Sequence, residues 1–94
     1  MKKQNNKINI DREATSTEHY FYLNNGITLK SIAELINQLD TMDQKIFNFH
    51  VHKKNNDFAN WVRDVFGEKQ LAKRMALTRS PGSMVKAITK FLKT

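Results

Sequence analysis

Two histidines, His50 and His52, are separated by one residue, and this spacing resembles that of metal ligands more than any other in the chain. On a strand the two imidazoles could chelate one ion, whereas on a helix they point apart. His19 is the remaining histidine and is weakly placed to serve as a third ligand. We therefore expect no bound metal, and we expect His50 to be structural, hydrogen bonded to a partner such as Asn56 or Asp57.

Two carboxylates, Asp57 and Asp64, are seven residues apart, a spacing that places them close to one face of a helix. Paired carboxylates can perform general acid–base catalysis, but the sequence has no nucleophile elbow, glycine-rich phosphate loop or metalloprotease helix. Helix capping by Asp57 and an ion pair between Asp64 and a nearby cation explain the two residues more simply. The sequence therefore predicts a protein that is not an enzyme and that uses no cofactor.

The formal charge of +7 is distributed unevenly along the 94 residues. Residues 1–10 carry +3, residues 11–66 carry −2 and residues 67–94 carry +6. Basic ends of this kind favour a polyanionic partner, nucleic acid first and an anionic membrane surface second. The alternative is that the net positive charge only keeps a small protein in solution.

The sharpest candidate site lies in the basic C-terminal part, where Arg79 precedes Ser80, Pro81, Gly82 and Ser83. A helix N-terminus favours phosphate, which the Ser80 hydroxyl and the amides of Gly82 and Ser83 could receive. Further basic side chains would extend this surface, and an N-terminal arm could follow a second stretch of nucleic-acid backbone. The residues that we assign to nucleic-acid binding are Arg79, Ser80, Ser83, Lys69, Lys73, Arg74, Lys86, Lys90, Lys93, Lys2, Lys3 and Lys7. In the alternative interpretation, Ser80 and Pro81 only begin a helix and the lysines only solvate its outer face.

The helix on which the fold depends is expected over residues 57–66. Asp57, or either asparagine before it, can cap the first turn, and Gly67 can adopt the left-handed conformation that ends the helix. The apolar side chains fall on one face with helical periodicity, and they are Phe58, Trp61, Val62, Val65 and Phe66. Burial of this face should make the helix the main contributor to the core.

The other elements follow from capping, turn and periodicity signals. We expect a flexible arm over residues 1–17, followed by one domain over residues 18–94. The domain should contain a hairpin over residues 20–29, helices over 31–40, 69–77 and 81–92, and a polar loop over 53–56. Residues 44–51 suit a second capped helix, but their dense aromatic side chains would also suit a strand. The predicted fold class is α+β and mostly α, a compact bundle of about five short helices with a small N-terminal β-hairpin.

The chain resembles a family of small uncharacterised domains that occur in archaea and bacteria, sometimes appended to larger proteins. The resemblance is carried by Phe49-His50-Val51, by the run from Asn56 to Gly67, and by Leu71-Ala72. An aromatic strand, a glycine turn and the helix that starts at Ser31 fit the same pattern, so that residues 19–92 are covered. Glu68 stands where the pattern often has Asp. The resemblance implies a fold, and it implies no activity. From the capping, periodicity and hydrogen-bonding patterns we assign structural roles to His50, Asp57, Phe58, Trp61 and Gly67.

No apolar run approaches the roughly 20 residues of a membrane span, and the chain has no cysteine. We therefore expect a cytoplasmic protein, with a nucleoid-associated or virion location as alternatives. The function that we expect is a non-catalytic module that contacts nucleic-acid backbone through its basic C-terminal surface. The alternative is a protein–protein interaction or assembly module with no role in nucleic-acid binding. The oligomeric state does not follow from the sequence.

Overall fold

The computed structural model describes residues 8–93. Within this range the chain forms five α-helices, a short 3₁₀ helix and two antiparallel two-stranded hairpins. In chain order the elements are η1 (Thr17–His19), β1 (Phe21–Tyr22), β2 (Thr28–Leu29), α1 (Ile32–Thr41), α2 (Gln44–His50), β3 (Val51–His52), β4 (Asn55–Asn56), α3 (Asp57–Phe66), α4 (Lys69–Met75) and α5 (Pro81–Leu92). The predicted α+β class, mostly α with a hairpin at its N-terminal side, is confirmed.

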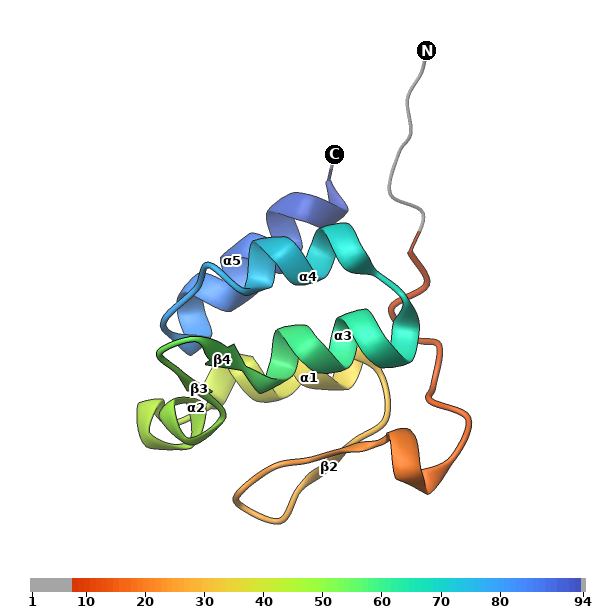
Figure 1. Cartoon of the computed structure of the whole chain (residues 1–94), viewed down its shortest axis with the longest axis horizontal. Helices are drawn as coiled ribbons and strands as arrows, with labels where there is room; N and C mark the ends of the chain where they lie inside the picture. Colours follow the sequence, from red (N-terminus) through yellow and green to blue (C-terminus); the bar gives the residue numbers. More distant parts are fainter. Residues whose placement is uncertain (1–7, 94) are drawn as a thin grey trace.

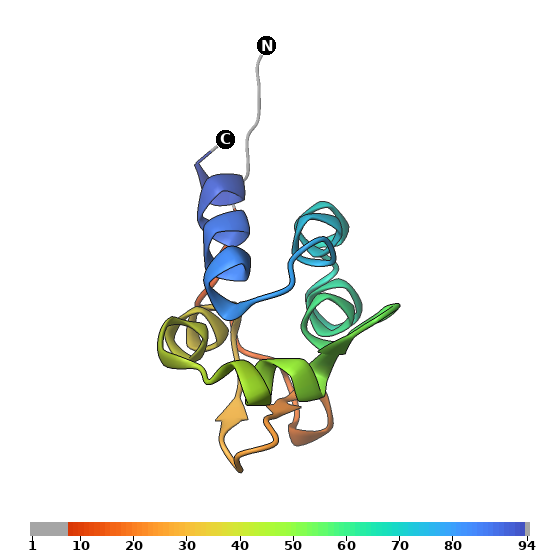
Figure 2. The ribbon, with the colours of Figure 1, turned by 90° about the vertical axis from the view of Figure 1, so that its left-hand side faces the viewer.

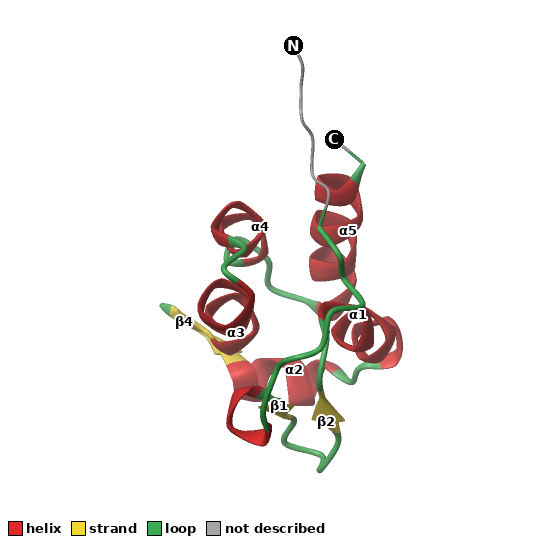
Figure 3. Ribbon diagram, turned by 90° about the vertical axis from the view of Figure 1, so that its right-hand side faces the viewer, coloured by secondary structure: helices red, strands yellow, loops and turns green. Residues whose placement is uncertain are grey.

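The helices are arranged as two packed pairs, α3 with α4 and α1 with α5, which lie side by side (Figure 2). α4 also packs against α5, and α2 crosses beneath the two pairs (Figure 3). The β1–β2 hairpin lies at the opposite end of the molecule from α4 and α5 (Figure 1). The β3–β4 hairpin projects sideways from α3, away from the body of the domain (Figures 2 and 3).

The apolar face of α3 is at the centre of the core, as its periodicity predicts. Phe58 and Val62 are fully buried, and the Phe21 ring from β1 stacks on Phe58 with centroids 4.9 Å apart. Trp61 is buried as well, and its Nε1 donates a hydrogen bond to the His19 carbonyl at 2.7 Å. A lone pair of short strands is not stable in water, so these contacts with α3 hold the first hairpin in place.

Helix ends follow the capping signals of the sequence. Ser31 caps α1 by accepting from the Glu34 amide, and Ser80 caps α5 by accepting from the Ser83 amide. Asn56, one of the three residues considered for this role, caps α3 by accepting from the Ala59 amide. Gly67 ends α3 with φ of +70°, a left-handed conformation that glycine adopts without steric cost.

Residues 8–14 differ from the flexible arm that we expected over residues 1–17, of which residues 1–7 lie outside the described part of the chain. Ile8 and Ile10 pack against the core and Ala14 is buried within it. The Ile10 carbonyl accepts from the Ala33 amide at 2.9 Å, and Arg12 donates to the Phe66 carbonyl at 3.1 Å. The first amides and last carbonyls of a helix lack partners within it, so residues 8–14 supply partners to the start of α1 and the end of α3.

A second hairpin replaces the polar loop that we expected over residues 53–56. Val51 pairs with Asn56 and His52 pairs with Asn55, and the turn between them places Lys53 at φ of +45°. Residues 44–51 were compatible with a helix or a strand, and they contribute to both. α2 runs to His50, and a strand begins at the next residue. Strands of two residues are too short to leave a periodic signal in the sequence.

α4 ends two residues earlier than predicted. The Met75 carbonyl accepts from the amide and the hydroxyl of Thr78 and from the Asn56 side chain, so the chain turns away from the helix there. Ala76 is exposed, and Leu77 is 80% exposed. These two side chains therefore contribute nothing to the core.

The Asn56 side chain should be the most sensitive polar position for stability. Asn56→Ala removes the cap of α3 and the buried bond to the Met75 carbonyl, and we expect a loss of about 2 kcal/mol in the free energy of unfolding. Urea denaturation followed by Trp61 fluorescence measures this loss. The matched control is Asn37→Ala on the exposed face of α1, which should leave the free energy of unfolding unchanged or slightly raised. Equal effects of the two substitutions would contradict the role given to Asn56.

Candidate functional site

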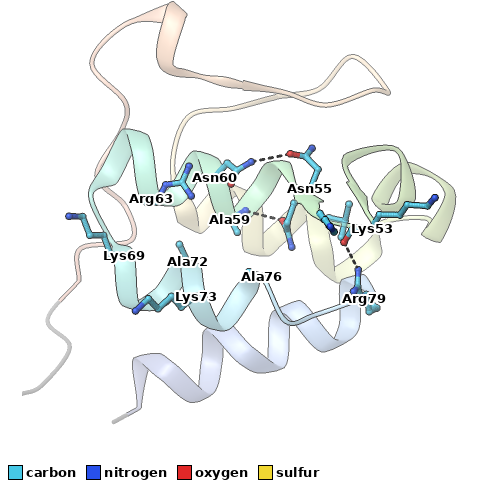
Figure 4. A pocket seen from close by; sticks show the side chains of 13 residues that line it. Lys53, Asn55, Ala59, Asn60, Arg63, Lys69, Ala72, Lys73, Ala76 and Arg79 are labelled. Carbon is cyan, nitrogen blue, oxygen red and sulfur yellow. Dashed lines mark hydrogen bonds between the residues drawn. The ribbon is translucent and has the colours of Figure 1, made fainter.

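A groove of about 480 Å³ lies between α3 and α4, with the β3–β4 hairpin at one end (Figure 4). α3 and α4 are joined by a tight turn at Gly67 and run antiparallel, so their facing sides form the two walls. Small side chains line the space between the walls: Ala59 from α3, and Ala72 and Ala76 from α4. Because these side chains end at Cβ, they leave space between the two helices.

The charged side chains that line the groove are, among the described residues, all basic. Six cations line it, and of the residues in its lining within the 8–93 range none is acidic. They are Lys53 and Lys54 from the hairpin, Arg63 from α3, Lys69 and Lys73 from α4, and Arg79 from the connection to α5. Like charges gathered on one surface favour an anionic ligand.

The hairpin end of the groove is held by Arg79. Its Nη1 donates to the Lys53 carbonyl at 3.2 Å, and the Arg79 carbonyl accepts from the Gln44 side chain at 3.1 Å. Asn60 donates to the Asn55 side chain at 3.3 Å and so joins α3 to the hairpin. These bonds fix the turn that carries Lys53 and Lys54 relative to both helices.

At the other end, Arg63 is paired with Asp64. Its Nε lies 2.8 Å from Asp64 Oδ1, and both side chains are exposed. The hydrogen bond from Arg63 lowers the pKa of Asp64, and the same bond raises the pKa of Arg63. Asp64 therefore stays ionised at neutral pH and offsets part of the positive charge at this end of the groove.

The predicted phosphate site at the start of α5 is occupied by its own side chains. The Ser80 hydroxyl accepts from the Ser83 amide at 3.1 Å, and the Ser83 hydroxyl accepts from the Ser80 amide at 3.1 Å. This is a complete capping box, in which both hydroxyls already bond the backbone. Ser80 and Ser83 therefore have a structural explanation, and Arg79 faces the hairpin rather than this helix end.

The predicted basic residues do not all line the groove. Lys69, Lys73 and Arg79 lie together in the groove lining, whereas Arg74, Lys86, Lys90 and Lys93 are outside it. Lys86 lines a separate hollow beside the end of α1 and the start of α5. Lys2, Lys3 and Lys7 lie outside the described residues.

Three groove cations were not assigned to the site from the sequence: Lys53, Lys54 and Arg63. They lie in the middle part of the chain, where acidic residues outnumber basic ones, and a count along the sequence hides them. The signal that could have found the two lysines is local, because only Asn55 separates Lys53-Lys54 from Asn56, the capping residue of α3.

His50 has the structural role expected of it, and Asp57 is one of its partners. The imidazole is 4% exposed, its Nδ1 lies 3.2 Å from Asp57 Oδ2, and its Nε2 accepts from the Asn24 amide at 3.1 Å. A neutral ring with the proton on Nδ1 satisfies both bonds. His50 therefore connects the turn of the first hairpin to the first turn of α3.

The remaining candidates for metal or acid–base chemistry are dispersed. His52 is exposed on β3, and His19 Nδ1 lies 3.1 Å from the Ser16 hydroxyl. Asp57 bonds His50 and Asn55, while Asp64 bonds Arg63, so the two carboxylates have separate partners. Among residues 8–93, no group of three His, Cys, Asp or Glu side chains is placed to hold a metal ion.

The fold and the groove define a class of protein: a small, mostly helical α+β domain with a basic groove between two antiparallel helices. A model of a family of unknown function, DUF5752, matches residues 14–84. The chain therefore belongs to the DUF5752 family, and its resemblance to a family of small uncharacterised domains is confirmed. No significant match was found among curated proteins or among solved structures. In the part of the chain that the structure describes, none of the helices has the length and apolar character needed to cross a bilayer.

His50→Leu tests the connection between hairpin and helix. The substitution leaves the partly buried Asn24 amide without its acceptor and removes the bond to Asp57, and we expect a loss of about 2 kcal/mol in the free energy of unfolding. Chemical denaturation provides the measurement. His52→Leu, a matched change on the exposed side of β3, should change stability by less than about 0.5 kcal/mol. A His50→Leu protein as stable as the parent would show that the two bonds contribute nothing.

Proposed function

We propose that this protein is a non-catalytic binding module and that the groove between α3 and α4 receives the phosphate backbone of nucleic acid. The observation that carries the proposal is the groove lining, in which six cations surround small side chains with no acidic residue among the described residues there. Phosphate contacts dominate the affinity of proteins for nucleic acid, and lysine and arginine supply most of them.

The composition of the groove supports backbone contacts rather than reading of the base sequence. Between the cations, the lining offers alanines and the asparagines 55, 56 and 60. Asn55 and Asn60 bond each other, and Asn56 is engaged in capping α3, so their amides are committed within the protein. Binding should therefore be independent of sequence and should weaken steeply as salt is added.

The lysines of α5 have a secondary part in this proposal. Lys86, Lys90 and Lys93 do not line the groove, and they contribute to the long-range positive field that attracts a polyanion. Removal of these lysines should weaken binding to nucleic acid less than removal of an equal number of groove lysines, although the change in net charge is the same.

The alternative function is a protein interaction or assembly module. Its support is the exposure of large apolar side chains, of which Tyr22 is 56%, Phe49 is 58% and Leu77 is 80% exposed. These residues belong to β1, to α2 and to the connection between α4 and α5, and none of them lines the groove. Single exposed apolar residues are common on protein surfaces, so the groove is the stronger observation.

Fluorescence anisotropy of labelled nucleic acid tests the proposed function. We expect binding that falls by at least about tenfold between roughly 50 and 200 mM salt. Lys69→Gln/Lys73→Gln should weaken binding by about tenfold and reduce the salt slope by about two. The matched control, Lys90→Gln/Lys93→Gln, removes the same charge from outside the groove and should weaken binding by no more than about threefold. Salt-independent binding, or equal effects of the two variants, would contradict the proposal.

Removal of the acidic residue beside the groove should have the opposite effect. Asp64→Asn eliminates the carboxylate that pairs with Arg63, so the guanidinium becomes available to phosphate and affinity should rise about two- to fivefold at low salt. The same anisotropy titration measures the change. Asp40→Asn, an exposed substitution of the same charge at the end of α1, is the control and should have a smaller effect. Unchanged affinity of Asp64→Asn would show that Arg63 takes no part in binding.

A further inference from the structure

The six groove cations are divided between the two ends of the groove (Figure 4). Arg63, Lys69 and Lys73 lie on either side of the turn at Gly67 and form the turn-end cluster. Lys53, Lys54 and Arg79 lie at the other end and form the hairpin-end cluster. The antiparallel arrangement is fixed there by the bond from the Asn56 side chain to the Met75 carbonyl, which joins the start of α3 to the end of α4.

The separation of the two clusters follows from helix geometry. Arg63 is six residues from Asp57, the first residue of α3, so the helix rises about 9 Å between them at 1.5 Å per residue. Lys53 and Lys54 lie beyond the start of the helix. The clusters are therefore on the order of 10 Å apart, with alanines and asparagines between them.

This spacing selects the size of the ligand. Two phosphates about 10 Å apart can contact both clusters at the same time. The major groove of B-form DNA, about 12 Å wide, separates the phosphates of its two strands by a similar distance. The groove therefore fits a polymer of phosphodiesters better than a single nucleotide.

The lining also distinguishes a duplex from a single strand. Proteins that bind single strands usually stack bases on aromatic side chains, and within the described chain no aromatic residue lines this groove. A single strand would have to be ordered to place its phosphates at both ends, without stacking contacts that offset the lost entropy. A double helix is stiff and already holds its phosphates at fixed spacing.

The two cation clusters of the protein are also held at a fixed spacing before a ligand binds. The bond from Arg79 to the Lys53 carbonyl and the bond between Asn60 and Asn55 hold the projecting hairpin relative to the two helices. Both cation clusters are thus carried by a connected, hydrogen-bonded frame, which lowers the entropy lost when a rigid ligand binds.

We infer that the groove is a two-ended clamp for double-stranded nucleic acid, with one cluster of cations on each of two phosphates about 10 Å apart. The inference rests on the proposed function and names the form of nucleic acid that the groove takes. It assigns Lys53 and Lys54 a contact with phosphate, and it assigns Arg79 the positioning of the hairpin in addition to its charge.

The test is a competition titration at low salt with the full chain. A labelled DNA duplex is displaced by unlabelled DNA duplex, RNA duplex, either separated DNA strand, or a nucleoside triphosphate. We expect the DNA duplex or the RNA duplex to compete at least about tenfold better than a single strand of equal length, and the triphosphate to compete least. Equal or better competition by the single strand would overturn the inference while leaving the proposed function in place, and absence of binding to every probe would overturn both.

Charge variants locate the two ends. Lys53→Gln/Lys54→Gln and Lys69→Gln/Lys73→Gln should each weaken duplex binding by about tenfold, and the four substitutions together should remove the preference for duplex over single strand. Lys90→Gln/Lys93→Gln serves as the control of equal charge. Thermal denaturation of each variant, which should match the parent protein because all these lysines are exposed, confirms that the fold is intact. An undiminished duplex preference in the fourfold variant would overturn the two-ended clamp.

Discussion

The structure depends on one buried asparagine more than on any other polar side chain. Asn56 ends the strand β4, caps α3 through the Ala59 amide, and donates to the carbonyl that ends α4. A single side chain thereby sets where the second hairpin stops, where the central helix starts and how the next helix lies against it. The positions of the two groove walls and of the hairpin at one end of the groove follow from this arrangement.

The interior of the domain and its basic surface are connected through the two faces of α3. One face buries Phe58 and Val62, with the Phe58 ring against Phe21 of the first hairpin and Phe47 of α2, while the other presents Ala59 and Arg63 to the groove. His50 joins the same helix to the first hairpin through Asp57, so a carboxylate that could serve acid–base chemistry is used for packing. The polar groups near α3 thus have structural partners, and Arg63, the one cation of α3, is exposed and paired with Asp64.

Much of the fold could be predicted because its signals are local. The apolar periodicity of residues 58–66, the serine caps of α1 and α5 and the glycine after α3 each act within a few residues of chain. The packing of residues 8–14 could not be predicted, because the groups that Ile10 and Arg12 satisfy are the ends of helices 23 and 54 residues away in the chain. The second hairpin was missed because two strands of two residues are held by α3 rather than by their own propensity.

The sequence by itself determined the helical core, the positions of the caps and the excess of positive charge, because composition, periodicity and capping are properties of short segments. Only the tertiary structure decided which charges lie together. It left the lysines of α5 outside the groove that Lys69 and Lys73 of α4 line, and it brought Lys53, Lys54 and Arg63 to that groove from a segment whose net charge is negative. The physical reason is that a charged surface is assembled from residues on different elements, and the antiparallel packing of α3 on α4 sets their neighbours.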